Sequence, residues 1–291
     1  ARGGLSVYAD RKDDLMFHRA ISGRGHVGIG GLVIVVGGAL SACSGDSKNS
    51  ADVTGPSAQT SAGATTLPTF DKLRSTLQSV QQQSNGGLGF NMWGSIVDRR
   101  GVVVAVVFTG NSPTEEWPGS RVISAQKANT ANAFSLTDFA LSTANLYAAT
   151  QPGGSLFGLQ ESNPVDPTTA YQGEVQDYGS PRDPMTGQKV GGINVFGGGL
   201  ALYGSDGTLL GALGVSGDLS CADHIIAWKV RHELGLDFVP KGVADGGKDD
   251  NIIFDLDSND HSASGFGHPV CNETTKSIAE NLPTSDPIGH K

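Results

Sequence analysis

The sequence has 291 residues, and its 20 Lys and Arg against 29 Asp and Glu give a formal net charge of −9. Nucleic-acid binding depends on basic residues that neutralise phosphates, so this acidic balance argues against a nucleic-acid partner. The same charge argues against electrostatic adhesion to an anionic membrane surface. The length is sufficient for one large domain or two small ones.

The first 42 residues have the pattern of an export signal. Arg19 and Arg24 provide a basic flank, and residues 27–40 (VGIGGLVIVVGGAL) form an uncharged apolar run. A membrane-spanning helix needs about 20 apolar residues, so this run is too short and is typical of a signal h-region. We expect residues 1–42 to be a signal peptide, in which Met16 is a candidate start and residues 1–15 an upstream extension.

Small residues lead from Leu40 into Cys43, which resembles the lipobox of bacterial lipoproteins. We therefore expect cleavage before Cys43 and lipid on its side chain, with the lipid as the only membrane contact. Ser44 fits the Gram-negative sorting rule for delivery to the outer membrane, on the periplasmic side of the cell envelope. Without residues 1–42 the chain keeps 15 basic and 26 acidic residues, a net charge near −11.

Residues 43–68 are rich in Ser, Thr, Ala and Gly, which predicts a flexible tether. An amphipathic helix follows, because Phe70, Leu73, Leu77 and Val80 recur at three- and four-residue spacing. It is expected to end near residues 84–87.

Two β-rich runs, residues 92–97 and 102–108, predict a hairpin. The second run is apolar on both faces, which predicts a central strand. A helix with a small-residue face is expected over residues 120–134, and a short helix over 138–149. The Pro- and Gly-rich stretch at 151–190 is long for a loop, and such loops usually carry function or wrap a partner.

A second hairpin is predicted from residues 198–203 and 209–215, which flank a turn containing Asp206-Gly207. Asp218 or Ser220 could cap a final helix that runs to about Leu234. This order of elements predicts an α+β fold in which helices pack on an antiparallel sheet. Residues 241–291 are expected to form a C-terminal covering arm.

Two cysteines, Cys221 and Cys271, remain after the signal. In an exported protein an even count favours a disulfide between them. Free buried thiols and metal ligation stay open as alternatives, although the residues lack the paired spacing of a zinc site.

Four segments in order resemble the GlcG/HbpS-like haem-binding family. They are Ile96–Val103, Lys127–Ala131 (KANTA), Gly191–Val195 (GGINV) and Gly211–Gly217 (GALGVSG). The resemblance covers about residues 70–235, within an expected domain at 69–240. It implies a profilin-like fold, binding of haem or a related tetrapyrrole, and homo-oligomers. Asn194 stands where the family usually has proline, and residues 151–190 and 236–291 exceed a minimal family domain.

The resemblance also implies a set of residues that contact the ligand. Lys127 could neutralise a propionate, or could be a helix lysine that extends to solvent. His224 is the candidate iron ligand, since haem sites commonly use a histidine; the alternative is a capping or surface histidine. For His232 a solvated helix end is favoured. The expected contacts are Lys127, Thr130, Phe134, Gly191, Gly192, Val215, Ser216, Gly217 and His224.

Taken together, these observations predict a lipid-anchored envelope protein that binds haem or a related tetrapyrrole, for storage, sequestration or sensing. We expect a binding protein rather than an enzyme. Two alternatives stay open. One is an enzyme that acts on a small carboxylate held by Lys127, and the other is a structural domain whose long loops bind a partner.

Overall fold

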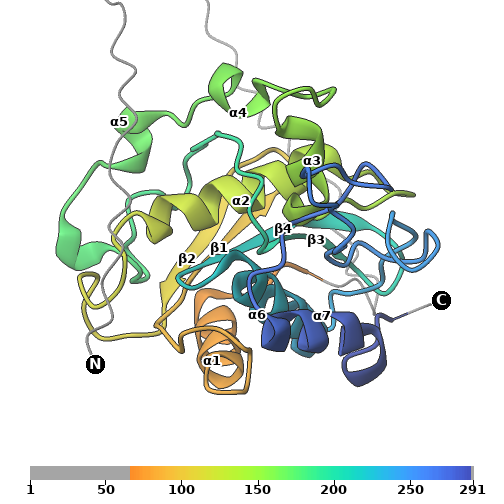
Figure 1. The fold of residues 1–291 in the computed structure, drawn as a ribbon. Helices are drawn as coiled ribbons and strands as arrows, with labels where there is room; N and C mark the ends of the chain where they lie inside the picture. The colour runs from red at the N-terminus through yellow and green to blue at the C-terminus, as the bar shows by residue number, and fades with distance from the viewer. Residues whose placement is uncertain (1–65, 290–291) are drawn as a thin grey trace, which may run out of the picture. The chain divides into compact units, whose positions relative to one another are not determined.

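A four-stranded antiparallel sheet lies at the centre of the computed structural model, which describes residues 66–289 (Figure 1). The strand order is β2-β1-β4-β3. The strands are β1 (Trp93–Asp98), β2 (Val103–Phe108), β3 (Gly199–Tyr203) and β4 (Leu209–Ser216). Both predicted hairpins are confirmed, and so is the α+β class. The predicted signal, Cys43 and most of the tether lie outside the described residues.

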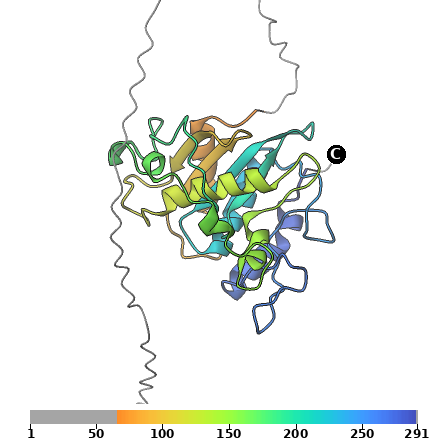
Figure 2. The same ribbon diagram turned by 90° about the horizontal axis from the view of Figure 1, so that it is seen from above.

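Helices cover both faces of this sheet (Figures 1 and 2). α2 (Ser120–Phe134) lies on one face, while α1 (Phe70–Gln81) and α6 (Ser220–Glu233) lie on the other, and α7 (Glu273–Ser285) packs beside α6. The remaining helices are single turns: η1 (Thr143–Leu146), α3 (Tyr147–Thr150), α4 (Leu159–Ser162), α5 (Pro167–Ala170) and η2 (Val175–Asp177). Among the described residues, no helix is long and apolar enough to cross a membrane.

The two apolar clusters follow from the alternation of side chains along the strands. On the α1 and α6 face, Ile96 and Leu213 are opposite one another and pack with Leu73 and Leu77 of α1. On the other face, Val97 and Ala212 pack with the small residues of α2. The spacing of apolar residues in residues 70–80 and 120–134 therefore predicted the buried faces of both helices correctly.

α2 lies unusually close to β4 because both carry small residues at the contact. A Cβ atom built on Gly214 would come 1.9 Å from the carbonyl oxygen of Ser124. The Ser124 hydroxyl in turn lies 2.7 Å from the hydroxyl of Ser95 on β1. A side chain at position 214 would push the helix away from the sheet, which explains the glycine in this part of the GALGVSG segment.

The prediction that residues 102–108 form a central strand is wrong, because β2 lies at the edge of the sheet. Its outer side is covered by the long insert, residues 151–190. The Val103 N–H donates to the Gln188 carbonyl at 2.8 Å, and the Gly187 N–H donates to the Val103 carbonyl at the same distance. The edge strand is apolar on both faces because α1, α2 and this insert all pack around it.

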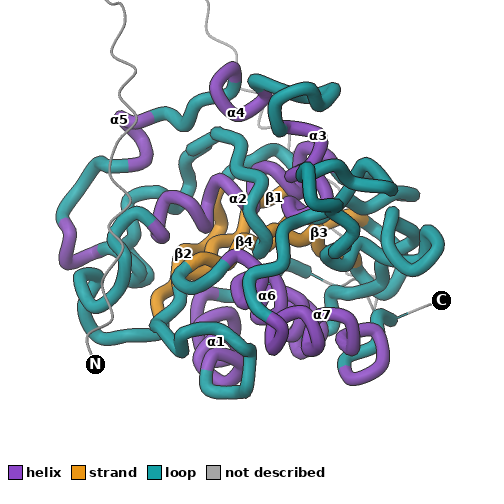
Figure 3. The backbone as a smooth tube through the Cα atoms, viewed as in Figure 1, coloured by secondary structure: helices purple, strands orange, loops and turns teal. Residues whose placement is uncertain are grey.

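A buried ion pair attaches the insert to the start of α2. The Arg121 guanidinium, 1% exposed, donates to the Asp183 carboxylate at 2.8 Å and to the Ala170 carbonyl at 2.8 Å. The ring of Tyr178 lies 3.6 Å from the guanidinium carbon. The insert is therefore an integral layer over α2 and β2, although loops make up most of its length (Figure 3).

Residues 241–289 pack against α6. Arg231 and Asp250, both fully buried, form a two-bond ion pair at 2.7 and 2.8 Å. The Trp228 indole N–H donates to the Asp286 carbonyl at 2.8 Å. The predicted disulfide is confirmed, and it joins Cys221 in the first turn of α6 to Cys271 just before α7. Helix α7 was not predicted; Asn272 caps it by accepting from the Thr275 N–H at 2.8 Å.

Two local predictions need correction. Neither Asp218 nor Ser220 caps α6, because its N-cap is Leu219, which makes no side-chain cap hydrogen bond. Both polar side chains instead bind other segments of the chain. The helix expected over residues 138–149 is limited to η1 and α3, and the residues before them form a turn in which Leu136 pairs with Phe139.

The disulfide closes a loop of 50 residues, and its loss increases the conformational freedom of the unfolded chain. We expect the double variant Cys221→Ala/Cys271→Ala to lose about 4 kcal/mol of unfolding free energy. Urea unfolding with and without dithiothreitol tests this. The reductant should destabilise the wild type and leave the double variant unchanged, and an unchanged wild-type midpoint would contradict the prediction.

Candidate functional site

A cavity of about 310 Å³ opens at the C-terminal end of β4, between the first halves of α2 and α6. Its wall combines large apolar side chains with buried polar groups. Both aromatic residues of the wall are exposed, since Trp117 is 52% and Phe196 is 47% accessible. The lining residues are Trp117, Ser120, Ile123, Lys127, Phe196, Ser216, Asp218, Leu219, Ser220 and Asp223.

Lys127 of α2 and Asp223 of α6 form a buried ion pair in this wall. The Lys127 Nζ lies 2.7 Å from Asp223 Oδ2 and also donates to the Val215 carbonyl at 3.0 Å. The other oxygen of Asp223 accepts from the Asp218 N–H at 2.9 Å. Burial raises the pKa of Asp223 to about 7, and the nearby ammonium opposes that rise. Burial likewise lowers the pKa of Lys127, which the carboxylate counteracts.

The backbone next to this pair requires glycine at position 198. Gly198 has a φ of +115°, and a Cβ atom there would come 2.4 Å from the Val215 carbonyl oxygen and 3.2 Å from the Lys127 Nζ. Without a side chain, the carbonyl of Gly198 can accept from the Val215 N–H at 2.8 Å. The start of β3 therefore approaches β4 directly beside the ammonium.

Asp218 contributes a carboxylate that is held by main-chain donors. It accepts from Leu88 N–H at 2.8 Å, from Gly89 N–H at 2.9 Å and from Leu219 N–H at 2.6 Å. These donors stabilise its negative charge and attach the loop after α1 to the edge of the cavity. Asp218 therefore holds the loop after α1 in place and also lines the cavity.

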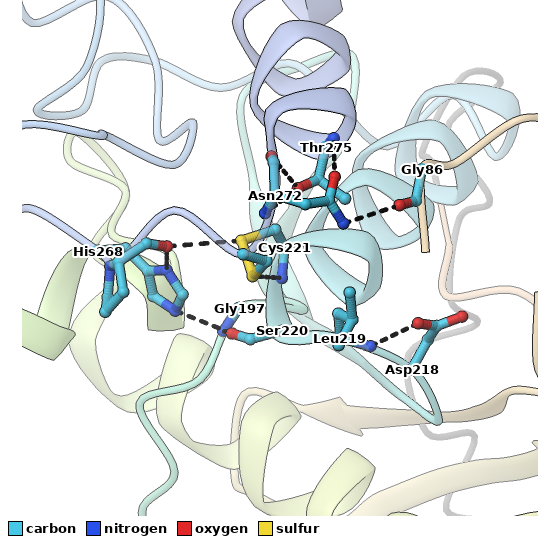
Figure 4. The surroundings of a disulfide bond; sticks show 11 residues. Gly86, Gly197, Asp218, Leu219, Ser220, Cys221, His268, Asn272 and Thr275 are labelled. Atoms are coloured by element: carbon cyan, nitrogen blue, oxygen red, sulfur yellow. Dashed lines mark hydrogen bonds between the residues drawn. A yellow bond between two sulfur atoms is a disulfide. The ribbon is translucent and has the colours of Figure 1, made fainter. Parts of the chain in front are cut away.

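Ser220, the first residue of α6, is hydrogen-bonded to His268 from the C-terminal region (Figure 4). The distance from Ser220 Oγ to His268 Nε2 is 2.8 Å, and His268 Nδ1 lies 2.7 Å from the Pro269 carbonyl oxygen. A carbonyl oxygen only accepts, so Nδ1 carries the proton and the Ser220 hydroxyl donates to Nε2. Burial lowers the pKa of His268 to about 4, which keeps the imidazole neutral.

The structure places two predicted side chains, Lys127 and Ser216, in the cavity wall. Val215 reaches it through its carbonyl group, which binds Lys127. The predicted Gly217 lies beside these residues, at a close approach to the Asn91 carbonyl. These residues cluster at the end of β4 because α2 crosses the strand there.

Other predicted residues lie outside the cavity lining. The Thr130 hydroxyl donates to Gln126 and accepts from the Asn194 N–H at 3.0 Å, which proline at position 194 could not provide. Gly191 and Gly192 belong to the segment held at Asn129, whose amide donates to the Gly192 carbonyl at 2.8 Å. Phe134 is the last residue of α2, two turns beyond Lys127.

His224 also lies outside the cavity lining, in the core between α6 and the C-terminal region. It is fully buried, and its Nε2 lies 3.1 Å from both the Asn251 side-chain oxygen and the Ile252 nitrogen. Burial lowers its pKa to about 3. Its Nε2 is therefore already bound by these two groups, whereas its Nδ1 has no hydrogen-bond partner among the described residues. His232 lies at the end of α6, as expected, but is bound to Asp237 at 2.8 Å.

Sequence reasoning predicted two of the ten lining residues as site residues and missed the other eight, as well as His268 behind the wall. Trp117 and Phe196 lie in loops without periodicity, and only their large apolar side chains in polar surroundings could have indicated a binding surface. Asp223 and His268 could not be connected to Lys127 and Ser220 before the fold was known. Within residues 66–289, no group of three or more His, Cys, Asp or Glu side chains could hold a metal ion.

Fold and cavity together define an α+β domain with a ligand-sized hollow at one end of its sheet. The family model described as "Haem degrading protein HbpS-like" matches residues 71–231. This match spans more than half of the sequence, and the chain therefore belongs to the HbpS-like family, as its sequence motifs indicated. No curated protein matches the chain.

The solved structures that are similar to the chain include the following two. PduOC, crystallised as a complex with haem, is 26% identical over 57% of this chain and 93% of that chain, with a TM-score of 0.39. Protein ORFY from Klebsiella pneumoniae, of family DUF336, is 22% identical over 60% of this chain and 94% of that chain, with a TM-score of 0.40.

The depressed pKa of His268 should make folding depend on pH. Between pH 7 and pH 5 the unfolded chain protonates this residue near pH 6.5, while the folded state does not until about pH 4. The free energy of unfolding therefore falls as the pH falls, and this residue accounts for about 2 kcal/mol of that loss between pH 7 and pH 5. The free energy of unfolding, measured with urea at pH 7 and at pH 5, should fall between the two pH values by about 2 kcal/mol less in His268→Gln than in the wild type. His261→Gln, at an exposed position, is the control, and equal losses in all three proteins would contradict the assignment.

Proposed function

We propose that this protein binds a tetrapyrrole, either haem or a metal-free relative, in the cavity between α2 and α6. The observation that carries the proposal is the combination of exposed aromatic walls with a buried ammonium group in one hollow. Family membership supports it, because the family description names haem. Storage, sequestration or sensing are the roles that binding of this kind would serve.

The apolar part of the wall is suited to a flat macrocycle. Ligand sites are largely lined by hydrophobic and aromatic side chains with a few convergent polar groups. Trp117 and Ile123 come from the α2 side, and Phe196 and Leu219 come from the loops before β3 and α6. Their positions around the cavity mouth would let them contact a ring that is only partly enclosed.

The polar part of the wall is suited to a propionate. An ammonium has three N–H donors, and Lys127 uses one on Asp223 and one on Val215. A ligand carboxylate could accept the third. A second negative charge beside Asp223 would raise the pKa of Asp223 further, and since that pKa is already about 7, proton uptake could compensate for the added charge.

The same wall does not fit a conventionally ligated haem iron. Axial ligands to haem are commonly His, Cys, Met or Tyr. None of these residue types lines the cavity within the described part of the chain. The residues therefore fit the macrocycle and its carboxylates, and we propose that the iron adds little to the affinity.

This proposal predicts similar binding of haemin and of metal-free protoporphyrin IX. Titration of the purified protein should give a saturable Soret shift with both compounds. Phe196→Ala should weaken both affinities by about tenfold, because an aromatic contact contributes about 1.5 kcal/mol. Phe157→Ala, exposed on the insert, should bind as the wild type does.

Absence of saturable binding of either compound at micromolar concentration would contradict tetrapyrrole binding. A distinct result, binding of haemin alone that is lost in His224→Gln, would contradict the proposed cavity and restore His224 as the iron ligand.

We also propose that the protein is anchored in the cell envelope through lipid on Cys43. The Cys221–Cys271 disulfide supports an exported protein, because disulfides persist in oxidising compartments. The acidic composition leaves the lipid as the means of membrane attachment. Assembly into a homo-oligomer, which the family resemblance implies, is part of the same proposal.

Expression in a Gram-negative host tests the anchor. Intact-mass measurement should show the wild type cleaved before Cys43 and carrying acyl chains. Cys43→Ser should stay unprocessed and lack the acyl mass. A wild-type protein without lipid would contradict the anchor and leave tetrapyrrole binding unaffected.

A further inference from the structure

We propose that Ser220 is a nucleophile activated by His268, and that the cavity accepts small apolar esters whose acyl group is transferred to the Ser220 hydroxyl. The proposal rests on the hydrogen-bond geometry around Ser220 and on its place in the cavity wall. Tetrapyrrole binding is not required for it.

The arrangement has the three components of an activated serine. The nucleophile and its base lie 2.8 Å apart, within the range that such pairs occupy. The base is oriented by a third group, because the Pro269 carbonyl accepts from His268 Nδ1 at 2.7 Å. This leaves Nε2 unprotonated and directed at the Ser220 hydroxyl, as proton abstraction requires.

The surroundings of Ser220 favour negative charge on its oxygen. The Gly197 N–H donates to Ser220 Oγ at 2.7 Å. Ser220 is also the first residue of α6, a helix of 14 residues, whose N-terminal end carries a partial positive charge. The Lys127 ammonium, although paired with Asp223, lines the same cavity, and its remaining N–H could donate to the oxyanion that forms on a substrate carbonyl.

Ser220 and His268 differ in their exposure to solvent. Ser220 is partly exposed and lines the cavity, whereas His268 is only 3% exposed and lies behind it. Trp117, Ile123 and Leu219 line the same hollow and would contact an apolar acyl or alcohol group. A small ester, and then a water molecule, could therefore reach Ser220 from the cavity, while most of His268 is covered by protein.

Other contacts already attach the C-terminal region at this point. The disulfide joins Cys221, the neighbour of Ser220, to Cys271 (Figure 4). The Asn272 side chain donates to the Gly86 carbonyl at 3.2 Å. These bonds hold the segment in addition to the hydrogen bond between Ser220 and His268. His268 lies beyond residues 71–231, so the family match does not account for it.

The reaction has two steps, acylation of Ser220 and hydrolysis of the acylated serine. Ser220 Oγ forms a bond to the ester carbonyl carbon while its proton passes to His268 Nε2. The ester C–O bond then breaks, and the leaving alkoxide takes that proton, which leaves an acylated Ser220. Water repeats the sequence with the same proton route and releases the carboxylic acid.

The test uses the full mature chain, free of tetrapyrrole, and a fluorophosphonate probe. The probe loses fluoride as Oγ bonds to phosphorus, and peptide mass spectrometry should place the adduct on Ser220. Ser220→Ala should abolish labelling, whereas Ser277→Ala, an exposed serine on α7, should label at the wild-type rate. Hydrolysis of 4-nitrophenyl acetate should likewise be lost in Ser220→Ala and unchanged in Ser277→Ala.

His268→Gln separates a base from a structural contact, because glutamine can accept the Ser220 hydrogen bond but cannot take its proton. The labelling rate should fall at least about 100-fold, the usual contribution of a general base. His261→Gln should label at the wild-type rate. No adduct on wild-type Ser220, or equal rates in His268→Gln and the wild type, would overturn the proposal.

Discussion

The buried ion pair between Lys127 and Asp223 joins the two sides of the molecule. Lys127 belongs to α2 on one face of the sheet, and Asp223 belongs to α6 on the other. Burying both charges costs several kcal/mol for each ion, so the pair is stable only with good geometry and further hydrogen bonds. The Val215 carbonyl and the Asp218 N–H provide those bonds. The end of β4 is therefore the point around which both helices are positioned.

This constraint explains why the cavity lies where it does. Two helices that approach the end of one strand from opposite faces leave a hollow between their first halves, with the ion pair in its wall. The small residues at Gly214 and Ser124 let α2 come close enough for Lys127 to reach Val215. The C-terminal region then packs on the outer side of α6 and brings His268 to Ser220. Tetrapyrrole binding and serine reactivity would share the apolar wall and Lys127 of this hollow, and only the reactivity would use Ser220 with His268.

The spacing of apolar residues along the chain predicted individual helices and strands. The spacing of Leu73, Leu77 and Val80 predicted α1, and the two β-rich runs predicted the hairpin of β1 and β2. The edge position of β2 could not be predicted, because its apolar faces are covered by segments distant in sequence. The position of His224 in the core could not be predicted either, because helix periodicity cannot distinguish the cavity side of α6 from the side that meets Asn251.

The sequence by itself determined the α+β class, the family, the two hairpins and α2 with its small-residue face. These features follow from side-chain periodicity and glycine placement, which are visible along the chain. For Cys221 and Cys271 the sequence favoured a disulfide but left other states open, and the structure decided for the bond. Only the tertiary structure decided the partners of Lys127 and Ser220 and excluded His224 from the cavity lining. Asp223 lies 96 residues from Lys127, and His268 lies 48 residues from Ser220. Contacts at such separations depend on how the layers pack, which no local pattern specifies.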